Sequence, residues 1–141
     1  MLTVSELAKR SSINAHTVRY YIRTGLLTPT KTQENSYRLF AIENVNRLKF
    51  IRTAKLLGFT LSDIQLILGH AQQGESPCPE VRVLIQKRMQ EIEEKVQDMQ
   101  ALQQRMVTAL ERWENMPDQQ PDSQSICHLI ESMTNIDNKQ N

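Results

Sequence analysis

The sequence is poor in the residues that build large aromatic pockets, phosphate loops and covalent cross-links. Its 141 residues contain three phenylalanines, three tyrosines, one tryptophan, four glycines and only two cysteines, Cys78 and Cys127. Two cysteines are too few for a disulfide framework, so we expect free thiols or metal ligands. No glycine-rich phosphate loop and no nucleophile–base–acid set is apparent, which argues against an enzyme.

Long apolar runs are also missing. No stretch approaches the 18 or more apolar residues of a membrane-spanning helix, and no charged-then-apolar leader precedes the first helical pattern. We therefore expect a cytoplasmic protein with no membrane partner.

The net charge of +1 conceals an asymmetry between the two parts of the chain. Residues 1–55 carry ten Lys and Arg against three acids, a net charge of +7, and the rest of the chain carries −6. A basic segment on a nearly neutral chain is typical of a nucleic-acid-binding domain.

The first 25 residues have the pattern of a helix-turn-helix. Thr3 and Glu6 have capping-box spacing and open a helix that ends near Arg10. A polar turn over 11–14 precedes a second helix that Gly25 ends. The side chains of this second helix that we expect to face DNA are Asn14, His16, Thr17, Arg19, Tyr20 and Arg23.

The residues that follow lack helical periodicity. Pro29 and the polar run 30–36 fit a two-stranded wing that closes at Tyr37 and Arg38. Helices are then expected from Glu43 to a stop at Gly58, and from a cap at Thr60 to a stop at Gly69. The sequence thus predicts an all-α fold with a small β-wing, in which residues 1–70 form a winged helix-turn-helix and 71–78 a connector.

A long helix is expected over residues 79–115, which contain no glycine. At 1.5 Å per residue it is roughly 50 Å long. Five of its apolar residues recur at intervals of seven: Ile85, Ile92, Met99, Met106 and Trp113. A heptad stripe on so long a helix is typical of a coiled coil. Residues 116–133 then form a polar loop and a short helix, and 134–141 are expected to be disordered.

These motifs resemble those of the MerR family of bacterial transcription regulators. The resemblance rests on the segment from Thr17 to Leu27 and on the wing sequence from Asn35 to Phe40. It implies a bacterial, nucleoid-associated homodimer whose long helices pair as an antiparallel coiled coil. It further implies a pseudo-palindromic promoter site, which the dimer kinks and undertwists so that RNA polymerase engages both promoter elements.

The resemblance also divides the DNA contacts into two kinds. Arg19 and Tyr20, and Tyr37 and Arg38 in the wing, match family residues that contact the DNA backbone. Asn14, His16, Thr17 and Arg23 remain as candidates for reading bases in the major groove. One departure is Asn35-Ser36, where the family usually has Asn-Gly.

An effector site is implied by the family's metal-sensing branch. In that branch a cysteine at the start of the dimer helix, here Cys78, faces a cysteine-bearing loop of the other protomer, here Cys127. Cys78 precedes Pro79 at the helix N-terminus, which favours the thiolate. Branches that sense divalent ions typically carry cysteine at this first position, whereas the copper(I)-sensing branch typically carries serine.

The loop departs from the family in lacking its first cysteine. His128 adjoins Cys127, and Glu114, Asp118 and Asp122 or His70 are further candidate donors. Imidazole and carboxylate suit borderline divalent ions. The expected effector is therefore a divalent metal ion of the zinc, cobalt, nickel, cadmium or mercury class, held by Cys78, Cys127 and His128.

Three alternatives stay open at this point. The chain could sense thiol oxidation at Cys78, or bind a small organic effector near the long helix. It could also be an architectural DNA-binding protein that needs no effector, which would leave both cysteines without a role.

Overall fold

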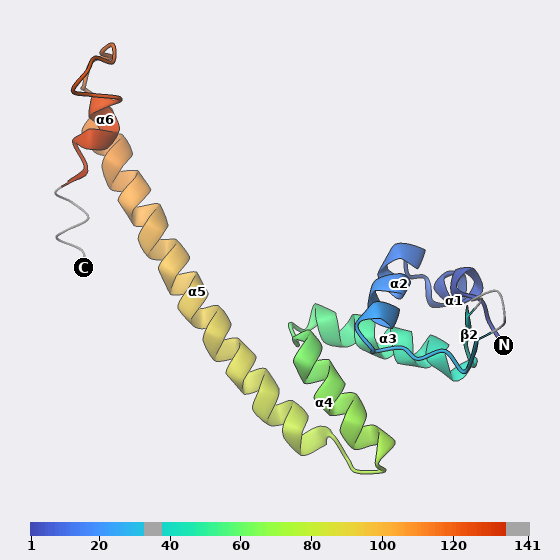
Figure 1. Ribbon diagram of the computed structural model, residues 1–141. Coiled ribbons are helices and arrows are strands. Elements are labelled where there is room, and N and C mark those ends of the chain that lie inside the picture. The colour runs from blue at the N-terminus through green and yellow to red at the C-terminus, as the bar shows by residue number, and fades with distance from the viewer. Residues whose placement is uncertain (33–37, 135–141) are drawn as a thin grey trace. The chain divides into compact units, whose positions relative to one another are not determined.

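The computed structural model describes residues 1–32 and 38–134. The chain divides into two compact units, a head of residues Met1–Met89 and an arm of residues Gln90–Asn141. Six helices and two short strands follow one another along the described chain, and Figure 1 shows their order. No helix among the described residues is both long enough and apolar enough to cross a membrane.

Helices α1 (Val4–Ser11) and α2 (Ala15–Arg23) form the predicted helix-turn-helix. The predicted capping box is present, because Thr3 and Glu6 exchange two hydrogen bonds of 3.2 Å between backbone N–H groups and side chains. Ser12 between the helices adopts a left-handed conformation with φ 57°. Gly25 has φ 83° and ends α2 as expected.

The wing consists of β1 (Lys31–Thr32) and β2 (Arg38–Leu39), which pair in antiparallel fashion with Lys31 opposite Leu39. A contact that the sequence did not reveal extends it: Leu2 and Phe40 form a bridge with two N–H···O bonds of 2.7 and 2.8 Å. Asn35, Ser36 and Tyr37 lie outside the described residues, as do residues 135–141 of the expected tail.

Helices α3 (Glu43–Leu56) and α4 (Leu61–Gln72) complete the head together with the beginning of α5. The expected stop at Gly69 is wrong, because α4 continues to Gln72. The left-handed residue is Gly74, with φ 75°. It lets Gly74 and Glu75 donate their N–H groups to the carbonyls of Ala71 and His70, which closes the helix end.

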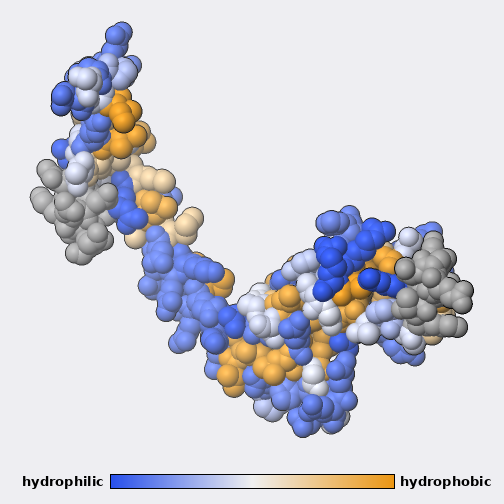
Figure 2. All heavy atoms as spheres, in the orientation of Figure 1, coloured by the Kyte–Doolittle hydropathy of each residue, from blue (hydrophilic) through white to orange (hydrophobic). Residues whose placement is uncertain are grey.

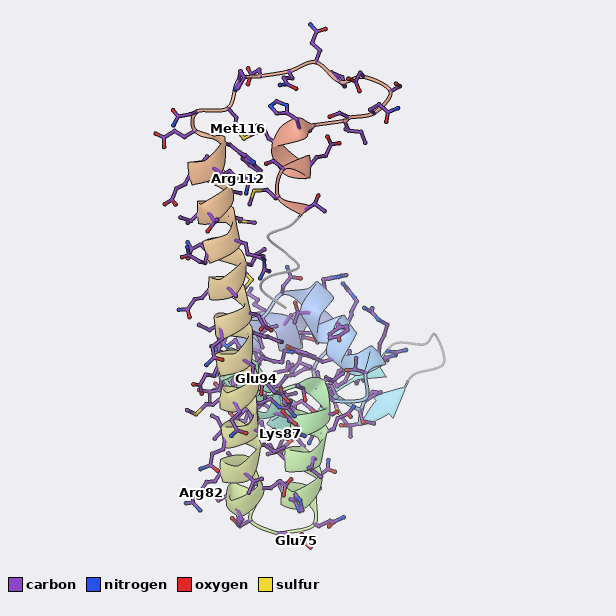
Figure 3. All side chains as sticks on the ribbon, turned by 90° about the vertical axis from the view of Figure 1, so that its left-hand side faces the viewer. Glu75, Arg82, Lys87, Glu94, Arg112 and Met116 are labelled. Atoms are coloured by element: carbon purple, nitrogen blue, oxygen red, sulfur yellow. The ribbon has the colours of Figure 1, made fainter. Side chains whose placement is uncertain are left out.

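The core of the head draws on α1, α2, α3 and α4 and on residues that connect them. Its fully buried side chains include Leu7, Val18, Leu26, Leu27, Phe40, Leu48, Ile51 and Ile64. Leu84 of α5 joins the same cluster, and Val81 and Ile85 pack against it. Figures 1 and 3 show the first turns of α5 alongside α4. The head therefore buries a continuous apolar core within one chain.

Helix α5 runs from Cys78 to Trp113, a length of 36 residues. In the arm, a polar loop leads from its end to α6 (His128–Glu131), which is only four residues long. The apolar residues in and beside α6 are only partly covered: Leu129 and Met133 are half-buried, whereas Ile126 and Ile130 are exposed. The fold class predicted from the sequence is confirmed, with a longer α4 and a shorter α6.

Candidate DNA-binding surface and effector site

The outer face of α2 carries the expected DNA-facing side chains. His16, Arg19, Tyr20 and Arg23 are exposed, while Thr17 is half-buried. Val18 and Tyr21 on the opposite face are buried in the core. Figure 2 shows hydrophilic atoms over the visible side of α2. The helix thus presents a basic, polar surface of the size that enters a major groove.

Tyr20 belongs to this surface and not to the core. Its side chain is 44% exposed, and the Arg23 guanidinium carbon lies 5.9 Å from the centre of its ring. The rings of Tyr20 and Tyr21 are 5.7 Å apart, and Tyr21, buried beneath, supports the pair. This cation–π contact orients Arg23 along the helix surface.

Asn14 has a structural role that the base-reading prediction did not include. Its side-chain oxygen accepts the His16 N–H at 2.7 Å, so Asn14 is the N-cap of α2. That oxygen is therefore engaged at the helix end, and the amide N–H groups of Asn14 are the side-chain atoms that face away from this cap bond as donors.

In the wing, Arg38 is exposed at the start of β2 and stands opposite Thr32. The two chain segments that flank the wing are joined at its base, because Ala41 donates its N–H to Thr30 Oγ1 at 3.1 Å. Tyr37, the other predicted wing contact, lies outside the described residues.

Two of the ten basic residues counted in the first 55 serve the fold. Arg47 Nε donates to the Leu26 carbonyl at 2.8 Å, beside the end of α2. Arg52 Nη1 donates to the Ser11 and Ser12 carbonyls at 3.3 and 3.4 Å, at the end of α1. Burial lowers the pKa of Arg47. Sequence counting missed this role because the partners are distant backbone carbonyls.

Another contact joins α4 to α5 within the head. Asp63 is 4% exposed and accepts two hydrogen bonds from Arg88, from Nε at 2.8 Å and from Nη2 at 3.0 Å. The same carboxylate accepts the Thr60 N–H at 3.0 Å and so caps α4. Burial alone would raise the pKa of Asp63, but the bonds from Arg88 and Thr60 lower it overall.

In the arm, α5 exposes most of its heptad stripe. The exposed fractions of Ile92, Met99 and Met106 are 56, 65 and 61%. The exposed apolar residues that flank them on α5 are Val96, Leu102, Val107 and Leu110. Trp113 at the end of the stripe is half-buried, and its Nε1–H donates to the Leu129 carbonyl at 2.7 Å.

Two of the candidate effector residues in the head lie near the start of α5. Cys78 is an exposed free thiol at the first residue of the helix. His70 lies in the last turn of α4, where its Nδ1 is 3.0 Å from Glu75 Oε2. One ring nitrogen of His70 is therefore already engaged.

Two more candidates, Cys127 and His128, lie in the arm at the start of α6. Cys127 is a half-buried free thiol at the N-cap position. The Nε2 atom of His128 is buried and has no hydrogen-bond partner in the described part of the chain. Such an orphaned atom is costly and requires an explanation.

Nearby, Glu131 accepts hydrogen bonds from Ser125 Oγ at 2.5 Å and from the Ile126 N–H at 2.9 Å. These bonds lower the pKa of Glu131. Figure 3 shows α6 beside the last turns of α5, near the labelled Arg112 and Met116.

The described residues of one chain contain no group of three His, Cys, Asp or Glu side chains that could hold a metal ion. Among the described residues of a chain, Cys127 and His128 are neighbours without a third donor beside them. Cys78 belongs to the head and Cys127 to the arm.

Comparison with known proteins gives consistent matches over nearly the whole chain. Residues 2–71 match the family described as MerR HTH family regulatory protein, and residues 45–109 match the family described as MerR, DNA binding. The mercuric resistance operon regulatory protein of Bacillus cereus is 30% identical over 132 residues, covering 92% of this chain and 95% of that protein.

Two further matches extend the comparison. The HTH-type transcriptional regulator ZntR of Escherichia coli is 34% identical over 104 residues, or 73% of this chain and 74% of that protein. The crystal structure of the transcription regulator PbrR691 from Ralstonia metallidurans in complex with lead(II) superposes with a TM-score of 0.75. It is 26% identical and the match covers 95% of this chain and all of that one.

Proposed function

The chain belongs to the MerR family of helix-turn-helix transcription regulators, and from this premise we propose that it responds to a divalent metal ion by distorting promoter DNA. As a regulator of this family it is not an enzyme. The proposal has three parts: a DNA surface on the head, a dimer formed through α5, and a metal site built from both protomers.

The DNA surface is the exposed side of α2 together with the wing. Arg19, Tyr20 and Arg38 are assigned to phosphates, and His16, Thr17 and Arg23 to base edges. Asn14 is assigned to base edges through its amide N–H groups, while its oxygen caps α2. Tyr37 remains assigned to the DNA backbone from the sequence.

The dimer is supported by the exposed stripe on α5. Ile92, Met99 and Met106 lie more than half exposed on a helix with no covering element in the described arm. Exposed apolar patches of this kind mark interaction sites, and a heptad spacing is the pattern of two helices that pair through their side chains. A second copy of α5 supplies a matching stripe.

Antiparallel pairing links the two ends of α5. The stripe extends two heptads on either side of Met99, so two copies aligned there bring Ile85 level with Trp113 of the other protomer. By the same count Cys78, seven residues before Ile85, comes level with the loop that follows Trp113. This geometry favours a site shared between Cys78 of one protomer and Cys127 of its partner.

The residues present fit a metal ion. Cys78 and Cys127 are free thiols, and His128 has a ring nitrogen that no described residue satisfies. Two thiolates and an imidazole suit a borderline divalent ion such as zinc or cobalt. One relative is named for mercuric resistance and one structural neighbour holds lead(II), which supports a metal as effector.

A metal ion bound there would link the head of one protomer to the C-terminal loop of the other. This link would change the orientation of the two heads relative to each other. Because both heads hold the DNA, the change would bend and undertwist the promoter spacer so that RNA polymerase can engage it. Bending DNA over a site of this size costs on the order of 1–6 kcal/mol, which lies within the range of metal-binding free energies.

The decisive experiment mixes two inactive variants. Metal-free protein is titrated with Zn²⁺, Co²⁺, Ni²⁺, Cd²⁺ and Hg²⁺ beside Cys78→Ser and Cys127→Ser. Both variants should lose tight binding of the ion that the wild-type protein prefers. When they are unfolded together and refolded, each mixed dimer regains one complete site, so binding and metal-dependent transcription return in part.

Failure to recover in the mixture, with both variants inactive alone, would overturn the shared site. Tight binding that is indifferent to both substitutions would overturn the metal proposal. Activation by oxidant through Cys78, or DNA bending without any effector, would then identify a redox sensor or an architectural protein.

A further inference from the structure

Glu131 makes more hydrogen bonds than an exposed surface carboxylate requires. Its Oε1 accepts from Ser125 Oγ at 2.5 Å and its Oε2 accepts from the Ile126 N–H at 2.9 Å. Its own N–H donates to the Cys127 carbonyl at 3.1 Å. Glu131 therefore bonds to the two residues before Cys127 and to the carbonyl of Cys127 itself.

These bonds close a small ring around Cys127. The side chain of Glu131 holds the two residues before the cysteine, and its backbone holds the cysteine carbonyl. The ring is attached to α5, because Trp113 Nε1–H donates to the Leu129 carbonyl. It is continued into the loop by the Asp122 N–H, which donates to the Ser125 carbonyl at 2.9 Å.

A carboxylate beside a metal site can either bind the ion itself or hold the loop that carries another ligand. Both oxygens of Glu131 accept a hydrogen bond from the loop, so the carboxylate is oriented by the loop around Cys127. A cysteine on an unrestrained loop must be ordered when it binds, and that ordering reduces affinity. A loop that is ordered beforehand avoids this loss.

We infer that Glu131 is a positioning residue of the effector site, which holds Cys127 in place through Ser125 and the Ile126 N–H without touching the ion. The inference rests on the proposed function for its metal, while the bonds of the ring join only residues of this chain. A glutamine at 131 cannot restore it, because its amide nitrogen would face one of the two donors.

The test uses Co²⁺ as a spectroscopic probe of the full-length dimer. Glu131→Gln should weaken Co²⁺ binding about 10- to 100-fold, the usual effect of losing an outer partner of a metal ligand. Ser125→Ala should weaken it in the same direction, and the double variant should be no weaker than Glu131→Gln. At saturation the visible spectrum of bound Co²⁺ should match the wild type, because the ligands are unchanged. Glu111→Gln, which changes an exposed acid of the same arm that is not a candidate donor, is the matched control and should bind normally.

A changed Co²⁺ spectrum in Glu131→Gln would make Glu131 a ligand and overturn the inference, as would unchanged affinity. Hydrogen exchange of the Ile126 N–H in the metal-free protein gives a readout without metal. Protection that Glu131→Gln abolishes supports the ring, and rapid exchange in the wild type overturns it. If instead Cys127→Ser leaves the affinity for Co²⁺ unchanged, the proposed function fails. The exchange of the Ile126 N–H alone then decides whether the ring exists.

Discussion

The head and the arm differ in whether their apolar side chains are buried within one chain. The head buries Leu7, Leu48 and Ile64 completely inside one chain, and it uses Arg47 and Arg52 to satisfy backbone carbonyls. The arm leaves Ile92, Met99 and Met106 mostly exposed along α5. A unit with its own core can fold alone, whereas a single exposed helix of this length is stabilised mainly by packing against something else.

The comparison indicates which residues act within a chain and which act between chains. A substitution in the head should change the stability of the chain or its contact with DNA. A substitution on the stripe of the arm should change the association of two chains into a dimer.

The largest effect is expected from Met99→Glu at the centre of the stripe. Antiparallel pairing places the two new carboxylates near each other in an apolar seam, where an unpaired charge costs several kcal/mol. Dimer affinity measured by analytical ultracentrifugation should fall by on the order of 100-fold or more. Ala101→Glu, about half a turn away on the same helix, should leave the dimer intact. Equal losses in both variants would contradict the seam.

Asp63→Asn should destabilise the head by roughly 3 kcal/mol, because it removes the buried carboxylate that accepts two hydrogen bonds from Arg88. Since the pKa of Asp63 in the folded protein is below its ordinary value of 3.8, this stabilisation is present above that pH. It is lost as the pH falls through the lower folded-state pKa. Urea unfolding between pH 3 and 7 should show this loss in the wild type and not in Asp63→Asn. Asp98→Asn in the arm is the control.

Arg38→Ala in the wing should weaken binding to all DNA sequences alike and leave dimer affinity unchanged. A phosphate contact contributes through counterion release, so the slope of log K against log salt should become shallower by about one. Fluorescence anisotropy with operator and unrelated duplexes measures both effects. A loss confined to the operator would instead assign Arg38 to base reading.

The smallest effect is expected from Trp113→Phe, which keeps an apolar ring and removes the hydrogen bond to the Leu129 carbonyl. The contact is worth about 1 kcal/mol, and only α6 should loosen. Amide exchange at Glu131 and Ser132, whose N–H groups donate to Cys127 and His128, should accelerate while dimer affinity stays within a few fold. Unchanged exchange would mean that other contacts hold α6.

Local signals predicted much of the fold. The capping boxes at Thr3 and Thr60 and the glycine stops at Gly25 and Gly58 are present as expected. Each depends on residues within a few positions of one another. Gly69 misled the prediction because a glycine permits a left-handed residue without requiring one, and the chain closes α4 at Gly74.

For the candidate sites, the sequence identified the face of α2 and both cysteines but not what supports them. Counting charges could not tell Arg47 and Arg52 from DNA-binding arginines, since their carbonyl partners lie 21 and about 40 residues away. Glu131 looked like one more acid of a short helix. Its pairing with Ser125 depends on how the loop turns around Cys127.

The sequence by itself determined the helix-turn-helix, the basic face of α2 and the heptad stripe, because helical periodicity and capping are local properties of the chain. Only the tertiary structure decided that Asp63 holds Arg88 and that Trp113 donates to the Leu129 carbonyl beside α6. Those outcomes depend on which side chains and carbonyls meet after folding, and buried polar groups must find partners wherever the packed chain places them.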